Sequence, residues 1–182
     1  MAHQKSQRAR HFTAVAALLG VVAFLGWMPA YGDSAQASKL LQQAKISAAQ
    51  LKTDSEEMES FTSNQLTWQS HATQINRVKE HVNRTGKILA ELHDAREGAE
   101  PWQQEAIDKI TPMLQELASN TTSIIDHLND RRHTWHPEYT GYLNANAQLA
   151  SDLSRLITDS IDYGRAKSRT ENLGKNLGFS QS

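Results

Sequence analysis

The stretch WQSHATQINRVKEHVNRTGKILAEL, residues 68–92, decides the fold. Apolar residues, with one histidine and one threonine among them, recur in it at alternating spacings of three and four, which places them on one stripe of a single helix. The stripe consists of Trp68, His71, Ile75, Val78, Val82, Thr85, Leu89 and Leu92. The opposite face is polar and charged, so this amphipathic helix has to bury its stripe against other parts of the molecule or against a partner.

The chain on both sides of this stretch has the same helical period, and its predicted buried stripes fall in three further segments. The stripe of the first segment consists of Leu41, Ala44, Ala48, Leu51, Ser55 and Met58, and that of the third helix consists of Ile107, Ile110, Leu114, Leu117, Thr121, Ile124 and Leu128. The stripe of the fourth helix consists of Tyr139, Tyr142, Leu143, Asn146, Leu149, Leu153, Leu156, Ile157, Ile161 and Tyr163. We expect a first helix over residues 38–60, a third that begins at Pro101 and a fourth that begins at Pro137, because proline is favoured in the first turn of a helix. Short connections between helices favour antiparallel neighbours. The sequence therefore predicts an all-α domain over residues 38–172, an antiparallel up-down-up-down four-helix bundle, followed by a flexible C-terminal tail over residues 173–182.

Some boundaries inside the bundle allow two interpretations. The apolar stripe of the first helix is out of phase with that of the second, which predicts a turn near residues 62–64, with Ser63 as the N-cap of the second helix. One bent, continuous helix through residues 60–64 is the alternative. The stripe of the third helix keeps its phase across Pro112, so we expect a kink there rather than a break. Gly164 and the glycines after it predict that the fourth helix frays into the tail.

The first 37 residues are typical of a secretory signal peptide. The first ten residues include three cationic and no acidic side chains, and residues 12–28 are apolar. Ala35-Gln36-Ala37 then supplies a small-residue cleavage site, and Ala30-Tyr31-Gly32 offers a second, earlier one. An uncleaved membrane anchor is the alternative. We expect a periplasmic or secreted protein that meets the membrane only during export.

Composition and motifs exclude several classes of function. The 182 residues carry a formal net charge of −1 with no basic face outside the N-terminus, so we expect no nucleic-acid partner. Cysteine is absent, which excludes disulfides, thiolate metal sites and a cysteine nucleophile. We detect no phosphate-binding glycine loop, calcium loop or di-iron pattern. The sequence therefore predicts no catalytic residues, no resident cofactor and no enzyme activity.

The predicted topology gathers histidine and aromatic residues at one end of the bundle, where the second and fourth helices begin. His71 lies on the buried stripe and needs a partner there. We predict that a ligand, if one binds at this end, contacts His71, Trp68, Trp135, Tyr139 and Tyr142. A divalent transition metal would use His71, His127, His133 and His136, because imidazole suits such ions. A hydrogen-bonded structural histidine beneath a polar cap is the alternative to both.

Two short segments carry a resemblance to known proteins. WQSH (residues 68–71) and PWQQEAID (residues 101–108), with the proline-started last helix, resemble uncharacterised exported helical proteins of bacteria over most of the mature chain. This resemblance implies export and a helical fold and carries no known activity. We therefore predict a non-catalytic binding or interaction module of the cell envelope; a metal- or haem-binding bundle is the alternative. The b-type haem pattern needs a histidine on the last helix, where only His136 at its start is available.

Overall fold

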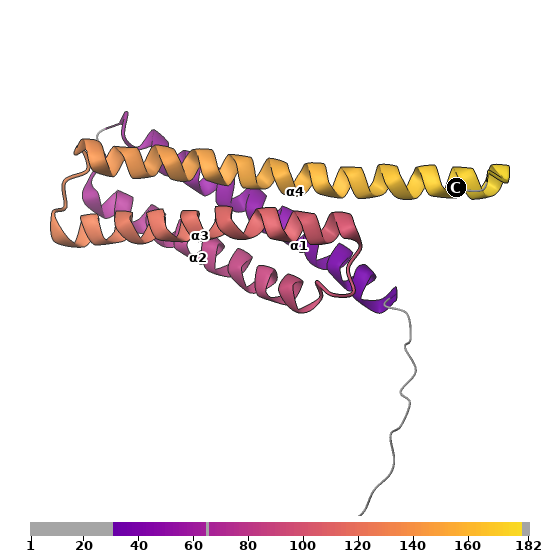
Figure 1. Cartoon of the computed structure of the whole chain (residues 1–182). Helices are drawn as coiled ribbons and strands as arrows, with labels where there is room; N and C mark the ends of the chain where they lie inside the picture. The colour runs from indigo at the N-terminus through magenta and orange to yellow at the C-terminus, as the bar shows by residue number, and fades with distance from the viewer. Residues whose placement is uncertain (1–30, 65, 180–182) are drawn as a thin grey trace, which may run out of the picture.

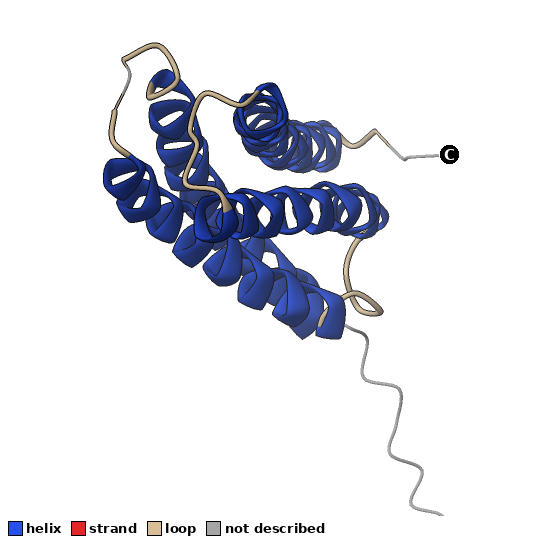
Figure 2. Ribbon diagram, turned by 90° about the vertical axis from the view of Figure 1, so that its left-hand side faces the viewer, coloured by secondary structure: helices blue, strands red, loops and turns tan. Residues whose placement is uncertain are grey.

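The computed structural model describes residues 31–64 and 66–179. Four α-helices make up most of this part: α1 (Tyr31–Ser60), α2 (Trp68–Asp94), α3 (Pro101–Asp130) and α4 (Pro137–Leu177) (Figure 1). No β-strand occurs among these residues (Figure 2). The predicted all-α, four-helix class is therefore confirmed. Most of the predicted signal peptide, residues 1–30, lies outside the described residues.

The four helices pack in a ring around one core. α1 packs against α2 and α4, and α3 packs against the same two helices. Figure 1 shows α3 and α4 side by side, with the end of α4 extending past the start of α3. Among the described helices, none is both long and apolar enough to cross a membrane.

The predicted apolar stripes are the buried faces of their helices. On α2, every member of the stripe except the half-buried Trp68 is buried. The predicted stripes of α1 and α3 are buried over their whole lengths. On α4 the stripe is buried on each successive turn as far as Ile161, and its other members up to that residue are half-buried. Tyr163 is exposed, contrary to the prediction. The helical phases read from the sequence are thus confirmed for the core.

The boundaries of α1 and the start of α2 differ in detail from the prediction. α1 begins at Tyr31 rather than at residue 38. It ends at Ser60, and a turn over residues 61–64 follows, so the predicted turn is confirmed and the bent continuous helix is wrong. The N-cap of α2 is Thr67 rather than Ser63, because the Thr67 hydroxyl accepts a hydrogen bond of 3.3 Å from the amide of Ser70. This bond satisfies one of the free amides of the first turn.

α3 and α4 are both continuous. α3 runs through Pro112 without a break. α4 does not fray at Gly164, which is buried in the middle of the helix, and it extends to Leu177, inside the predicted tail. There Gly178 adopts a left-handed conformation with φ of 72°, and the amide of Phe179 donates to the carbonyl of Gly174 at 3.0 Å. Glycine has no Cβ penalty in this conformation, so the helix ends in a formed cap.

The buried stripes predict a sharp contrast between adjacent positions on α2. We expect Val82→Asp on α2 and Leu117→Asp on α3 to abolish cooperative unfolding, because both side chains are buried in the core and a carboxylate there would have no partner. Asn83→Asp, on the exposed face next to Val82, should change the free energy of unfolding by less than about 0.5 kcal/mol. Urea denaturation followed by circular dichroism measures all three. Equal losses at positions 82 and 83 would contradict the assigned phase.

Candidate functional site

The structure brings together aromatic and histidine side chains at the end of the bundle where α2 and α4 begin. His71 Nδ1 lies 2.8 Å from the hydroxyl of Tyr139, and both rings are buried, at 1% and 0% exposure. Phe61 packs edge-on against His71, with ring centroids 5.4 Å apart. The Tyr139 ring lies 5.0 Å from that of His127, and His127 lies 5.7 Å from His136. The predicted meeting of these side chains is therefore present, as one continuous cluster of rings.

The four predicted metal ligands do not form a metal site. His127 Nε2 donates to the backbone carbonyl of His133 at 2.8 Å, while the exposed imidazole of His133 stacks on Trp135 with centroids 5.5 Å apart. His71 is engaged by Tyr139. Within residues 31–64 and 66–179, no group of three or more histidine, aspartate or glutamate side chains is placed to hold a metal ion. The prediction of a four-histidine metal site is corrected accordingly: His71 and His127 each use a ring nitrogen in a hydrogen bond, and the His133 ring stacks on Trp135.

The five residues predicted to bind a ligand divide into three groups by their burial. His71 and Tyr139 fill the interior and hydrogen-bond to each other. Trp68 and Tyr142 are half-buried against the core, and the guanidinium of Arg132 lies 4.7 Å from the Trp68 ring centroid. Trp135 is 75% exposed. A ligand at this end would have to displace packed rings, so ligand binding here stays a prediction.

Burial controls the protonation of His71. Desolvation by burial lowers the pKa of the imidazole below its usual 6.5, because the charged form loses its hydration. Burial also raises the pKa of the Tyr139 hydroxyl. His71 Nε2 has no hydrogen-bond partner in the described residues, so a proton added there would find no acceptor. The neutral imidazole, bonded through Nδ1, is therefore the form that the fold stabilises.

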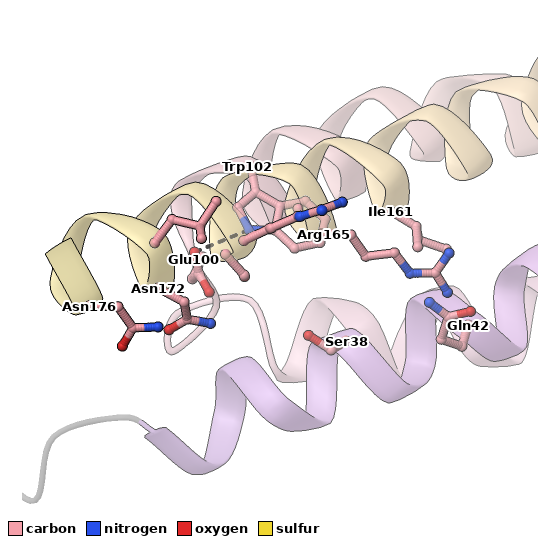
Figure 3. A pocket seen from close by; sticks show the side chains of 12 residues that line it. Ser38, Gln42, Glu100, Trp102, Ile161, Arg165, Asn172 and Asn176 are labelled. Carbon is pink, nitrogen blue, oxygen red and sulfur yellow. Dashed lines mark hydrogen bonds between the residues drawn. The ribbon is translucent and has the colours of Figure 1, made fainter.

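A groove lies at the opposite end of the bundle, between the first turns of α1 and the C-terminal part of α4. It has a volume of about 540 Å³. In Figure 3, Trp102 and Glu100 lie beside α4, and Ser38 and Gln42 face them from α1. We call this space the Trp102 groove. Sequence analysis did not identify it.

Gly164 of α4 makes room for the Trp102 indole. A Cβ atom at position 164 would fall 2.6 Å from Cη2 and 2.8 Å from Cε2 of Trp102, distances too short for two carbon atoms. Only glycine, which lacks a side chain, permits this close approach. The indole therefore packs directly on the backbone of α4 and forms a wall of the groove.

Hydrogen bonds hold the base of the groove in place. The Glu100 carboxylate accepts from Trp102 Nε1 at 3.1 Å and from Lys167 Nζ at 2.8 Å. Lys167 is the main reason that the pKa of Glu100 is lowered. The Gln103 side-chain amide donates to the Ser34 carbonyl at 3.0 Å and to the Ser38 hydroxyl at 2.8 Å. These bonds tie the start of α3 to both α1 and α4.

Two arginines and two asparagines of α4 line the same groove. Arg165 pairs with Asp162 at 3.2 Å in an exposed contact, and such contacts contribute little. Arg169 has no acidic partner among the residues that the structure describes. The groove therefore combines an aromatic wall with cationic and amide donors.

No protein-family model, curated protein or solved structure matches this chain. The resemblance to exported helical proteins accordingly stays a prediction, and the geometry of the chain itself has to support any functional conclusion.

The buried His71 predicts a stability that depends on pH. As the pH falls below 6.5, the unfolded chain takes up a proton at His71, whereas the folded chain resists protonation until a lower pH. Wild type should therefore lose stability between about pH 7 and pH 5. We expect the loss over this interval to be smaller in His71→Gln, even though that variant is less stable at neutral pH.

Urea denaturation at several pH values, followed by circular dichroism, measures this slope. His93→Gln is the matched control, because His93 is an exposed histidine on the same helix. Identical pH slopes in wild type and His71→Gln would contradict the inference that the fold favours the neutral imidazole.

Proposed function

We propose that this chain is a non-catalytic binding module, an up-down-up-down four-helix bundle that is exported to the cell envelope and takes a small ligand in the Trp102 groove. The groove carries this proposal. Its volume of about 540 Å³ falls within the range of roughly 300 to 1,000 Å³ found for small-molecule sites. It also combines an aromatic wall with a few converging polar groups, as such sites do.

The charged side chains of the Trp102 groove favour ligand binding over proton transfer. Glu100 is held as a carboxylate by Lys167 and the indole N–H of Trp102, and its lowered pKa keeps it charged at neutral pH. The guanidinium groups of Arg165 and Arg169 supply hydrogen-bond donors and no acceptor. A general acid or base needs a pKa near the working pH. These groups are suited to hold and orient a ligand.

Export is proposed on the N-terminal sequence, and the contacts of α1 favour the earlier of the two cleavage sites. Ala37 is buried in the core, and the carbonyl of Ser34 accepts a hydrogen bond from Gln103. Cleavage after Ala37 would remove both and place a new terminus beside the groove. Cleavage after Gly32 would keep both. We therefore propose Asp33 as the first residue of the mature protein.

We expect the purified chain to bind the uncharged dye N-phenyl-1-naphthylamine in the Trp102 groove, with a rise in dye fluorescence. Trp102→Ala should weaken the Kd by about tenfold, since one aromatic contact contributes on the order of 1 kcal/mol beyond its buried area. Trp135→Ala is the matched control, because Trp135 lies at the other end of the bundle and is 75% exposed. It should leave the Kd unchanged.

A second pair of variants tests the same groove without removing the tryptophan. Gly164→Ala would push the indole out of position and should weaken dye binding. Gly141→Ala, also on α4, is the control, because a Cβ at Gly141 meets nothing within 4 Å. Thermal melts confirm that each variant folds. Absence of dye binding to wild type, or equal binding by all four variants, would overturn the proposed site.

The proposed cleavage site predicts a defined mature protein. Intact-mass measurement and N-terminal sequencing of protein recovered from a bacterial envelope fraction should give a chain that begins at Asp33. A terminus at Ser38 would contradict the earlier site, and an intact Met1 or Ala2 terminus on membrane-bound protein would contradict cleavage itself.

A further inference from the structure

We infer, on the basis of the binding role proposed above, that the Trp102 groove takes an organic acid with an apolar portion. Arg165 and Arg169 bind the acidic group, and Trp102 packs against the apolar portion. In the groove, the carboxylate of Glu100 is paired with Lys167, whereas Arg169 has no acidic partner among the described residues.

The cationic side of the groove is placed to bind a carboxylate or a phosphate. Arg165 and Arg169 are four residues apart on α4, so they lie one above the other on the same face of the helix, and both line the groove. Arginine matches the planar geometry of these anions with two parallel hydrogen bonds. The Arg165 contact with Asp162 is solvent-exposed and leaves further donors on the guanidinium free.

Among the residues that the structure describes, Glu100 is the one carboxylate that lines the groove, and it is already paired with a cation. Both Lys167 and Trp102 donate to the same oxygen, Oε2, of Glu100. Lys167 also lies 3.5 Å from Glu171, so the lysine links two carboxylates. A cationic ligand would have to compete with Lys167 for Glu100, whereas an anionic ligand finds Arg169 without an acidic partner among the described residues.

The rest of the groove suits an apolar group. The Trp102 indole is fixed on one edge by its bond to Glu100 and on its face by the backbone at Gly164. Ile161 lines the groove from the core side, and the half-exposed Leu173 lines it farther along α4. A flat or extended apolar group covering these side chains would remove apolar surface from water, which favours binding.

A matched pair of ligands measures the contribution of the negative charge of the ligand to binding. 1-Naphthylacetate and its neutral amide, 1-naphthylacetamide, share the same aromatic ring system and differ in the acidic group. Each is used to displace N-phenyl-1-naphthylamine from the purified chain. We expect the acid to displace the dye at a concentration about tenfold lower than the amide does, because charge-assisted hydrogen bonds to arginine are stronger than neutral ones.

The arginines are tested in the same assay. In Arg165→Gln/Arg169→Gln the acid and the amide should displace the dye equally, once each displacement is corrected for the Kd of the dye measured with that variant. Arg155→Gln is the control, since Arg155 is an exposed arginine of α4 that does not line the groove. It should keep the preference for the acid.

The outcomes separate this inference from the proposed function. Equal displacement by acid and amide in wild type would overturn the acidic ligand and leave the binding site standing. Failure of the dye to bind wild type would overturn the site itself. A preference for the acid that survives in the double variant would show that other groups bind the anion, and would overturn the role of the two arginines.

An acid of this kind is available free or as part of a lipid, and vesicles distinguish the two sources. Cosedimentation with phosphatidylglycerol vesicles but not with phosphatidylcholine vesicles, lost in the double variant, would support the same groove with a lipid as the source. Displacement by 1-naphthylacetate without cosedimentation would support a free acid.

Discussion

The close approach of α1 to its two neighbours is the contact on which the rest of the bundle depends. α1 packs against both α2 and α4, and its buried face mixes leucine and methionine with small residues, including Ala44, Ser47 and Ala48. Small side chains bury little area, so they contribute mainly by letting backbones come near. The Ser47 hydroxyl reaches Thr85 of α2 at 2.8 Å, which satisfies two buried polar groups and fixes how far one helix can slide along the other.

The interior of the bundle is filled in different ways at its two ends. Where α2 and α4 begin, the rings of His71, His127 and Tyr139 fill the interior and contact one another. At the other end α4 is longer than α3, with 41 residues against 30, so part of it has no helix of equal length beside it. Trp102 covers some of this exposed length. The space beyond the indole is the groove, and its lining mixes apolar side chains with polar and charged ones.

Local periodicity predicted the fold. The features that the sequence did not predict depend on contacts between residues far apart in the chain. The phases of all four helices follow from apolar spacing within single segments, and the grouping of His71 with Tyr139 followed from chain direction. That the two side chains would satisfy each other, with a 2.8 Å bond, depends on rotamers that no pattern encodes. The Trp102 groove was missed because it depends on Gly164, which is remote in sequence and resembled a residue at which a helix frays.

The ring of helices closes between its first and last members, and this order has a consequence for folding. The chain is synthesised from its N-terminus, so α1 is complete before α4 exists. The face of α1 that packs against α4 is therefore unpaired during this interval. Contacts between segments so far apart form late, because the long intervening loop has to be closed first. An unpaired face made only of leucine would associate with other unfolded chains. On α1, alanine and serine interrupt the leucines of the buried face, which reduces the apolar area that is exposed during the delay.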